Sequence, residues 1–250
     1  MKKNFEKYSK YYDLLYKDKN YQNESDYVAG LIKKHNAQAK KILELGCGTG
    51  NHAAILCQSG YSVTGLERSA DMVSLAAQKN ISNFEPKVAD ITDFELNGKF
   101  DVAVSLFHVL SYLTDNKNLL SCFTAVNRHL NKEGIFIFDV WYSPAVYVQR
   151  PETRVKRMSN DEIEVTRIAE SDIHYNLNVV DVNYEIIIKD KKSGVAEVHN
   201  EKHPMRHFSV PEIELLAAAT NFTLIKSEEF GTGNTPGSDT WGVCFVLQKK

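Results

Sequence analysis

The 250-residue chain has only four cysteines, and no two of them form a CxxC pair. Cys47, Cys57, Cys122 and Cys244 lie far apart, so we expect neither a metal site nor a disulfide framework. A chain of this length can bury enough apolar surface to fold without such cross-links. The pattern favours free, buried thiols in the reducing cytoplasm.

Long hydrophobic runs and an excess of one charge are also missing. No segment approaches the roughly 18 consecutive apolar residues that span a membrane, and residues 1–16 lack the apolar core of a signal peptide. The formal net charge of -2 argues against a general binder of nucleic acid or membrane surfaces. We therefore expect a cytoplasmic protein with a small-molecule partner and neither a nucleic-acid nor a membrane partner.

Short apolar runs alternate with helix-period segments between residues 40 and 140. Strands are expected at 40–45, 61–67, 84–90, 99–107 and 134–140. Helices are expected at 52–59, at 69–79 with Ser69 as N-cap, and at 116–130. This alternation predicts a doubly wound α/β fold whose mostly parallel sheet is covered on both faces.

The pattern changes after Trp141. Residues 153–203 hold alternating runs without a good helix, which predicts an antiparallel β insertion with Gly194 at a hairpin tip. A helix is then expected at 209–221, with Ser209 as cap, Pro211 in the first turn and Asn221 at its end. Two strands, 222–230 and 240–248, complete the chain. We accordingly divide it into a core with its N-terminal cap at 1–150, the insertion at 151–206, and the return of the core at 207–250.

Three glycines, Gly46, Gly48 and Gly50, follow the first strand in the run ELGCGTGNH (44–52). Such a turn from a parallel strand into a helix bares backbone to a ligand. A P-loop is excluded because no Lys-Ser/Thr pair follows, and a dinucleotide loop would have a third glycine where Asn51 stands. A turn without function is the remaining alternative, which the preceding Glu44 makes less favourable.

The run E-L-G-C-G-T-G (44–50) resembles the nucleotide loop of class I S-adenosylmethionine-dependent methyltransferases. L-N-K-E-G-I-F (130–136) resembles that family's late turn into its fifth strand, with Glu133 in place of a glycine. The resemblance implies a Rossmann-like, seven-stranded sheet. It also implies S-adenosyl-L-methionine as cofactor, S-adenosyl-L-homocysteine as product, and no metal.

The resemblance assigns the cofactor-binding residues. Glu67 ends the second strand, where an acid would accept both ribose hydroxyls, and Asp90 ends the third, where it would bind the adenine amino group. Either acid alone is more often a solvated strand-end carboxylate, but their joint spacing favours cofactor binding. The expected set is Lys19, Tyr21, Gly46, Cys47, Gly48, Gly50, Glu67, Arg68, Asp90, Ile91 and Leu106. In it, Ile91 packs on the adenine ring, and Lys19 or Tyr21 pairs with the methionine carboxylate.

Three further segments narrow the resemblance: YYDLLYKDKNY (11–21), SLFHVLSYL (105–113) and FDVWYSP (138–144). They are similar to segments of bacterial nucleotide-linked amino-sugar N-methyltransferases, such as dTDP-3-amino-sugar N,N-dimethyltransferases. This similarity runs over nearly the whole chain, although its markers are less specific than the glycine loop. It implies a nucleotide sugar as substrate, and the insertion offers strand edges for a homodimer.

Tyr12 and His108 are the expected catalytic residues. Methyl transfer from a sulfonium is an in-line displacement that depends mainly on positioning, and an amine nucleophile must arrive neutral. The ring of Tyr12 would face the sulfonium, and His108 would orient the amine or receive its proton. The alternatives are that the N-terminal tyrosines only pack and that His108 is a buried structural histidine.

Substrate binding is assigned to six residues, and a diphosphate would call for cations on one face of the insertion. Arg206 is favoured because MRHF leads the insertion back to the main sheet. The alternatives are that such cations only solvate edge strands and that Trp141 plugs the core instead of stacking on a sugar or base. The six residues are Tyr16, Tyr112, Trp141, Arg154, Arg167 and Arg206.

Other functions stay open at this point. One is methylation of another small molecule, such as glycine or a phenolic hydroxyl. Another is an NAD-dependent oxidoreductase, which Asn51 disfavours. A third is a protein that binds the cofactor without turnover, because methyl transfer requires no single indispensable residue.

Overall fold

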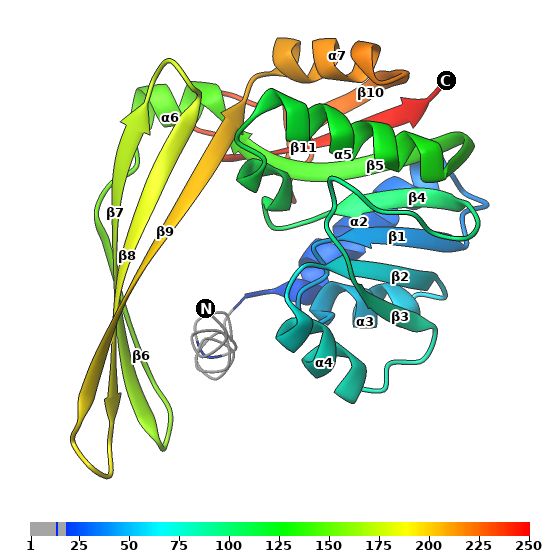
Figure 1. Ribbon diagram of the computed structural model, residues 1–250. Helices are drawn as coiled ribbons and strands as arrows, with labels where there is room; N and C mark the ends of the chain where they lie inside the picture. The colour runs from blue at the N-terminus through cyan, green and yellow to red at the C-terminus, as the bar shows by residue number, and fades with distance from the viewer. Residues whose placement is uncertain (1–13, 15–18) are drawn as a thin grey trace.

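Figure 1 shows the computed structural model, which describes Leu14 and residues 19–250. Tyr12 and Tyr16 lie outside the described residues, so their expected roles stay predictions. Within the described part of the chain, no helix is both long and apolar enough to cross a membrane.

The core is a seven-stranded sheet in the order β3-β2-β1-β4-β5-β11-β10. The first five strands are parallel, and β11 runs antiparallel to both β5 and β10. This confirms the expected doubly wound, mostly parallel α/β sheet. The strands are β1 (Lys41–Leu45), β2 (Ser62–Glu67), β3 (Phe84–Val88), β4 (Phe100–Ser105), β5 (Leu130–Tyr142), β10 (Phe222–Glu229) and β11 (Gly242–Lys249).

Helices cover both faces of this sheet, because strands such as β1 and β5 are apolar on both sides. Residues of α2 and α3 pack on one face, and residues of α5 and α7 pack on the other. The sequence pattern missed α2, α6 and the short 3₁₀ helix η1. The helices are α2 (Tyr21–His35), α3 (Asn51–Gln58), α4 (Ala70–Gln78), η1 (Val109–Tyr112), α5 (Asn116–His129), α6 (Ser143–Gln149) and α7 (Val210–Ala219).

Two of the expected helix starts can be compared with the structure. Ser69 caps α4, because its hydroxyl oxygen accepts the Met72 N–H at 3.3 Å. Ser209 holds the N-cap position of α7, as expected, although its side chain makes no capping hydrogen bond. Pro211 does lie in the first turn of α7, as expected.

The insertion is an antiparallel sheet in the order β9-β8-β7-β6, which Figure 1 shows as a long, twisted ribbon beside the core. Gly194, at φ 74°, lies in the turn between β8 and β9, as expected. The expected boundary at residue 206 falls inside β9, because that strand continues without a break into the core. The strands are β6 (Arg154–Ser159), β7 (Ile163–His174), β8 (Val179–Asp190) and β9 (Ala196–Phe208).

One short pairing joins the insertion to the core sheet. The pairing of β4 with β5 ends at Ser105 and Phe138, but β5 continues to Tyr142. Along this overhang β9 pairs with β5 in parallel, at Trp141 with His207 and at Tyr142 with Phe208. The insertion is thereby held beyond the carboxyl end of β4, where ligands of doubly wound folds bind.

Candidate active site

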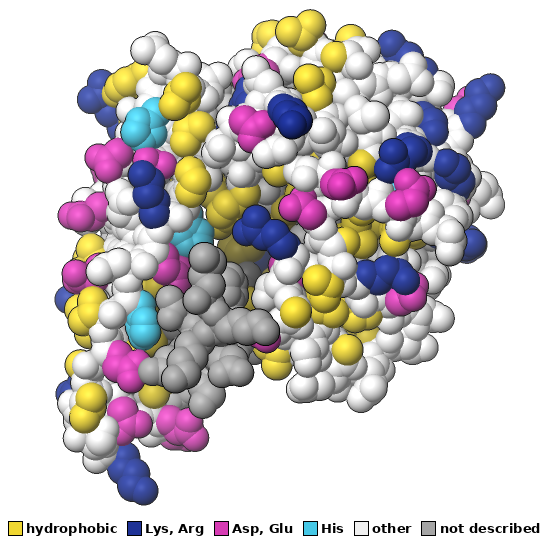
Figure 2. Space-filling model, in the orientation of Figure 1, with side chains coloured by type: hydrophobic (Ala, Val, Ile, Leu, Met, Phe, Trp, Pro, Cys, Tyr) yellow, Lys and Arg dark blue, Asp and Glu magenta, His cyan; other side chains and the backbone are white. Residues whose placement is uncertain are grey.

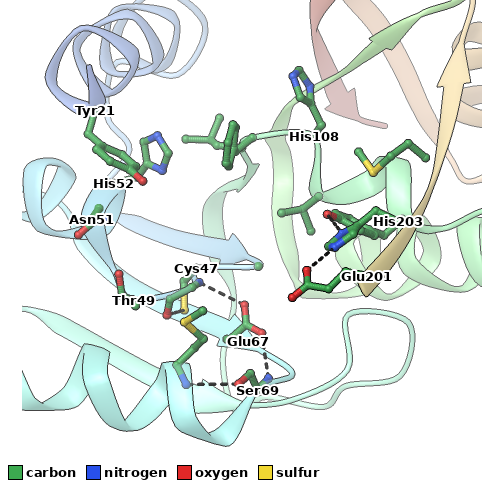
Figure 3. Close-up of a pocket in the computed structure, with 18 of the residues that line it drawn as sticks. Tyr21, Cys47, Thr49, Asn51, His52, Glu67, Ser69, His108, Glu201 and His203 are labelled. Carbon is green, nitrogen blue, oxygen red and sulfur yellow. Dashed lines mark hydrogen bonds and ion pairs between the residues drawn. The ribbon is translucent and has the colours of Figure 1, made fainter. Parts of the chain in front are cut away.

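A cavity of about 300 Å³ lies between the carboxyl ends of the core strands and the insertion. Figure 2 shows hydrophobic side chains inside a hollow between these two parts, and Figure 3 shows residues that line it. Ten of the expected site residues line this cavity: Tyr21, Gly46, Cys47, Gly48, Glu67, Leu106, His108, Tyr112, Trp141 and Arg167. The remaining described ones are not part of its lining: Lys19, Gly50, Arg68, Asp90, Ile91, Arg154 and Arg206.

The three glycines of the loop have different surroundings. An added Cβ at Gly48, where φ is 53°, would meet no atom within 4 Å. At Gly50 it would lie 2.6 Å from the ring of Phe84, and at Gly46 it would lie 2.6 Å from Val109. Gly48 therefore leaves open space at the cavity, whereas Gly50 is needed for packing against β3.

Glu67, at the end of β2, ties the glycine loop to the start of α4. Its Oε2 accepts the Gly48 N–H at 3.2 Å, and its Oε1 accepts the Ser69 N–H at 2.8 Å (Figure 3). Both oxygens are thus fixed by backbone donors while the side chain stays half-buried in the cavity wall. Such a carboxylate is positioned to accept further hydrogen bonds from a ligand's hydroxyls.

Glu44 is a second acid at this loop, and sequence reasoning gave it no role. It is buried on β1, and its Oε2 has no hydrogen-bond partner among the described residues. Burial, with a contribution from the charge of Glu67, raises the pKa of Glu44 to about 8. An acid inside the apolar run KILEL was the signal that could have identified it.

Asp90 lies in an exposed turn after β3. Its Oδ1 accepts both the N–H of Thr92, at 2.8 Å, and the Thr92 hydroxyl, at 2.7 Å. These two hydrogen bonds lower the pKa of Asp90 despite some burial. They also end the strand two residues earlier than expected, because the side chain closes a local turn.

Lys19 is drawn into an ionic cluster beside the cavity. Its Nζ lies 2.5 Å from Glu24 Oε1, and Glu24 Oε2 lies 2.7 Å from His52 Nε2. Burial alone raises the pKa of Glu24, but the hydrogen bonds and charges of His52 and Lys19 outweigh it and lower that pKa. The Nζ of Lys19 also lies 3.8 Å above the ring of Phe107, which lines the cavity.

His108 follows β4 in a strained backbone conformation. The φ angles of Phe107 and His108 are 65° and 60°. Residues other than glycine rarely adopt this left-handed conformation, and those that do are concentrated at functional sites. The strain also explains why the strand stops at Ser105 instead of reaching residue 107.

Asp139, on β5, holds His108 in place. Its Oδ2 accepts the backbone N–H of His108 at 3.2 Å and lies 2.7 Å from Nδ1, an ion-pair distance without the angle of a straight hydrogen bond. Burial raises the pKa of Asp139, but the nearby charge of His108 and the hydrogen bond from its backbone outweigh it and lower that pKa. The lone acid within the apolar run GIFIFDV was the only sequence signal for this residue.

Trp141 lies beside this pair. Its ring is 6.4 Å from that of His108 and 5.9 Å from that of Trp241, in edge-on contacts. It packs against the buried cluster of Val146, Val180 and neighbouring residues, and it also lines the cavity. Its position is compatible with both roles considered from the sequence.

Side chains of the insertion form the opposite wall of the cavity. Tyr112 Oη lies 2.9 Å from His203 Nδ1, and His203 Nε2 lies 2.9 Å from Glu201 Oε2. The guanidinium of Arg167 lies over the ring of Tyr184, with 4.9 Å from Cζ to the ring centroid. Sequence reasoning missed Glu201 and His203, although their alternate positions in EVHNEKH place them on one face of a strand.

Two of the expected arginines have other surroundings. Arg206 is buried and donates to Asn116 Oδ1 at 2.8 Å and to Glu212 Oε1 at 2.6 Å, so it joins the start of α5 to α7 instead of reaching the cavity mouth. Arg154 is exposed on β6, the outer strand of the insertion. Of the insertion arginines proposed for substrate, only Arg167 lines the cavity.

The chain is similar to known methyltransferases. Residues 42–134 match the sequence family described as "Methyltransferase domain". The dTDP-3-amino-3,6-dideoxy-alpha-D-glucopyranose N,N-dimethyltransferase of Streptomyces fradiae is 27% identical over 239 residues, covering 90% of this chain and 86% of that protein. The putative methyltransferase YqeM of Bacillus subtilis (strain 168) is 30% identical over 218 residues, 84% of each chain. The crystal structure of an S-adenosylmethionine-dependent methyltransferase from Clostridium acetobutylicum ATCC 824 has the same fold, with a TM-score of 0.82, 22% identity and 98% of each chain covered.

Proposed function

The chain belongs to the class I S-adenosylmethionine-dependent methyltransferases, and on that premise we propose that it methylates the amino group of a nucleotide-linked deoxyamino sugar. S-adenosylmethionine is its cofactor. The observation that carries the proposal for an amine is the His108–Asp139 pair, whose imidazole lines the cavity. The Streptomyces fradiae relative supports the sugar, because its name gives a dTDP-linked amino sugar and it aligns with 90% of this chain.

The residues at the glycine loop fit the cofactor. Gly48 leaves open space, and the buried Glu44 Oε2, near the end of the strand before the loop, has no hydrogen-bond partner among the described residues, which is unusual for a buried polar atom. We assign Gly48 to the methionine part and Glu67 to the ribose hydroxyls, because both line the cavity, whereas Glu44 does not. Bound there, the cofactor supplies an electrophilic methyl group on a sulfonium. Asp90, which lies in an exposed turn after β3, stays a proposed ligand of the adenine amino group.

His108 would prepare the acceptor amine. Because Nδ1 lies 2.7 Å from the Asp139 carboxylate, the proton is favoured on Nδ1, and Nε2 is then the nitrogen that accepts a hydrogen bond or a proton. The buried carboxylate stabilises the imidazolium that forms and fixes the position of the ring. The amine then keeps its lone pair for attack on the methyl carbon, which an ammonium ion cannot do.

Arg167 would bind the diphosphate of the acceptor. Its guanidinium lies on the Tyr184 ring in the cavity wall, and its Nε has no hydrogen-bond partner among the described residues. A planar, permanently charged donor group suits a phosphate oxygen. The wall would thus bind the anionic part of the acceptor while the core side holds the amine.

A competition assay tests this function. Purified protein with radiolabelled S-adenosylmethionine is offered dTDP-linked amino sugars, the matching sugars without nucleotide, glycine and a phenol. We expect methylation of the nucleotide-linked amines with at least tenfold preference over the free sugars. Methylation of only glycine or the phenol would show that the acceptor assignment is wrong.

A further inference from the structure

The inner face of β9 presents acids and histidines in alternation. Residues 197, 199, 201 and 203 are Glu, His, Glu and His, and the period of a strand places all four on one face. Two of them, Glu201 and His203, line the cavity. Figure 3 shows both side chains at the cavity, joined by a dashed line.

A hydrogen-bonded chain of three side chains runs along this wall. Tyr112, from η1, lies 2.9 Å from His203 Nδ1, and His203 Nε2 lies 2.9 Å from the carboxylate of Glu201. An ionised carboxylate only accepts, so Nε2 must carry a proton and Nδ1 accepts the Tyr112 hydroxyl. The order is a hydroxyl, an imidazole and a carboxylate, which is the arrangement that moves a proton away from a hydroxyl.

Aromatic contacts hold the imidazole in this orientation. The ring of His203 is 5.0 Å from that of Tyr184 and 5.8 Å from that of Tyr112, both edge-on. The titratable groups that face His203 among the described residues are Glu201 on its own strand, Tyr112 from η1 and Tyr184 from β8. Arg167 of β7 lines the same cavity, and its guanidinium lies on the Tyr184 ring.

We propose that Tyr112, His203 and Glu201 form a second proton-accepting group of the active site, which removes a proton from the acceptor's ammonium group. This inference rests on the proposed function. In the step, the ammonium N–H bond breaks and its proton goes to Tyr112 Oη while the Tyr112 hydroxyl proton goes to His203 Nδ1. The products are a neutral amine, an unchanged phenol and an imidazolium paired with the Glu201 carboxylate.

Methylation of an amine requires a group that accepts protons. Aliphatic amines such as lysine titrate near pH 10, so the acceptor arrives as an ammonium, and each methylation again gives an ammonium product. One proton is therefore lost before the first attack and another before any second one. His108 accepts a proton on the core side of the cavity. Tyr112 lines the cavity and is 49% exposed, so a proton that reaches this relay can pass on to solvent.

The first test reads the protons on His203 directly and needs no substrate. Long-range ¹H–¹⁵N NMR of the histidine rings is recorded for the wild type, Tyr112→Phe, Glu201→Gln and the control Tyr147→Phe. Tyr147 is bonded to Asn178 and does not line the cavity, so its variant leaves the His203 signals unchanged. We expect the neutral wild-type ring to be protonated on Nε2, with its nitrogen shifts altered in both relay variants. A neutral ring protonated on Nδ1, or a ring that takes up no proton on acidification, would overturn the relay.

The second test measures kcat/KM against pH with dTDP-3-amino-3,6-dideoxyglucose as the acceptor. We expect Tyr112→Phe and Glu201→Gln to lose about a hundredfold near neutral pH and to recover as the pH rises toward the amine's own titration. A merely structural role would lower the rate equally at all pH values. If the acceptor is methylated and both variants keep the wild-type profile, the relay is refuted. If the wild type does not methylate it, the proposed function fails, and the NMR result alone decides whether the relay exists.

Discussion

The Nδ1 atom of His108 lies 2.7 Å from Oδ2 of Asp139, and the same oxygen accepts the backbone N–H of His108. One buried carboxylate thus fixes both the left-handed backbone and the ring orientation of the histidine at the end of β4. A side chain that only filled space would not need two contacts with one acid. A substitution in this pair should therefore lower the rate of methyl transfer while the protein still folds.

Replacing Asp139 by Asn tests the pair. The amide keeps the size of the side chain but loses the charge that stabilises an imidazolium, so we expect kcat to fall roughly a hundredfold or more. The affinity for S-adenosylmethionine, measured by calorimetry, should stay within about threefold of the wild type, since Asp139 does not line the cavity. An unchanged kcat would remove His108 from the proton-accepting role.

The raised pKa of Glu44 should make the free energy of unfolding depend on pH. Its pKa is about 8 in the native state against 4.5 as its ordinary value, so the native state binds the extra proton between these pH values. The free energy of unfolding should therefore fall as the pH rises through this window, and Glu44→Gln should show a smaller fall. Urea unfolding from about pH 5 to about pH 9 without cofactor measures the difference. Parallel curves for the two proteins would contradict the assignment.

Two glycine substitutions should separate cofactor binding from stability. Gly48→Ala places a methyl group in open space, so we expect a loss of only about 1 kcal/mol in stability but at least tenfold weaker cofactor binding. Gly50→Ala places a Cβ 2.6 Å from the Phe84 ring, and we expect a loss of roughly 2–4 kcal/mol. Thermal unfolding and calorimetric titration measure both effects. Equal effects on cofactor binding in folded protein would show that Gly48 does not face the ligand.

Glu67→Gln should weaken cofactor binding about tenfold to a hundredfold, because the side chain loses its charge and one of the two oxygens that accept the Gly48 and Ser69 N–H groups. The matched control is Glu85→Gln on the neighbouring strand β3. Glu85 is exposed, and among the described residues its side chain pairs only with Lys87, at 2.6 Å, so its change should alter neither binding nor stability measurably. If the two variants bind the cofactor equally well, the ribose assignment is wrong.

Two arginines allow stability to be separated from substrate binding. Arg206→Met leaves Glu212 without its buried partner, and we expect a loss of about 3 kcal/mol in stability. Arg167→Met removes a cation from the cavity wall, and we expect near-normal stability with a KM for the nucleotide sugar raised about tenfold. Denaturant unfolding and initial rates on both variants check this. If the KM for the nucleotide sugar is unchanged in Arg167→Met, Arg167 is not part of the acceptor site.

The sequence was enough to predict that Gly46, Gly48 and Glu67 meet at one cavity, because its signals there are local. The glycine loop lies within seven residues, and Glu67 follows at the end of the next strand, so strand alternation alone places both at one edge of the sheet. The expected strands at 84–90 and 99–107 ended early for reasons that also act locally, at the Asp90 turn and at the left-handed Phe107 and His108. These features need backbone angles that composition does not reveal.

The acceptor half was harder to predict because its contacts join distant segments. The sequence predicts a role for His108, which lines the cavity, but its partner Asp139 lies thirty-one positions later, inside the apolar run of a buried strand. Tyr112 and His203, which are hydrogen-bonded, lie ninety-one positions apart, and the sequence around either residue gives no sign of the other. Arg206 was misplaced for the same reason, since its ion pair with Glu212 depends on how α7 docks.

The overhang of β5, where only Trp141 and Tyr142 pair with β9, has a consequence for how acceptor preference can evolve. In the part of the chain that the structure describes, the strands that carry Arg167, Tyr184, Glu201 and His203 share no other strand pairing with the sheet that carries the glycine loop. Side chains on those strands can therefore change without disturbing the backbone hydrogen bonds under the cofactor. Such a chain can exchange one acceptor for another while the methyl donor stays the same.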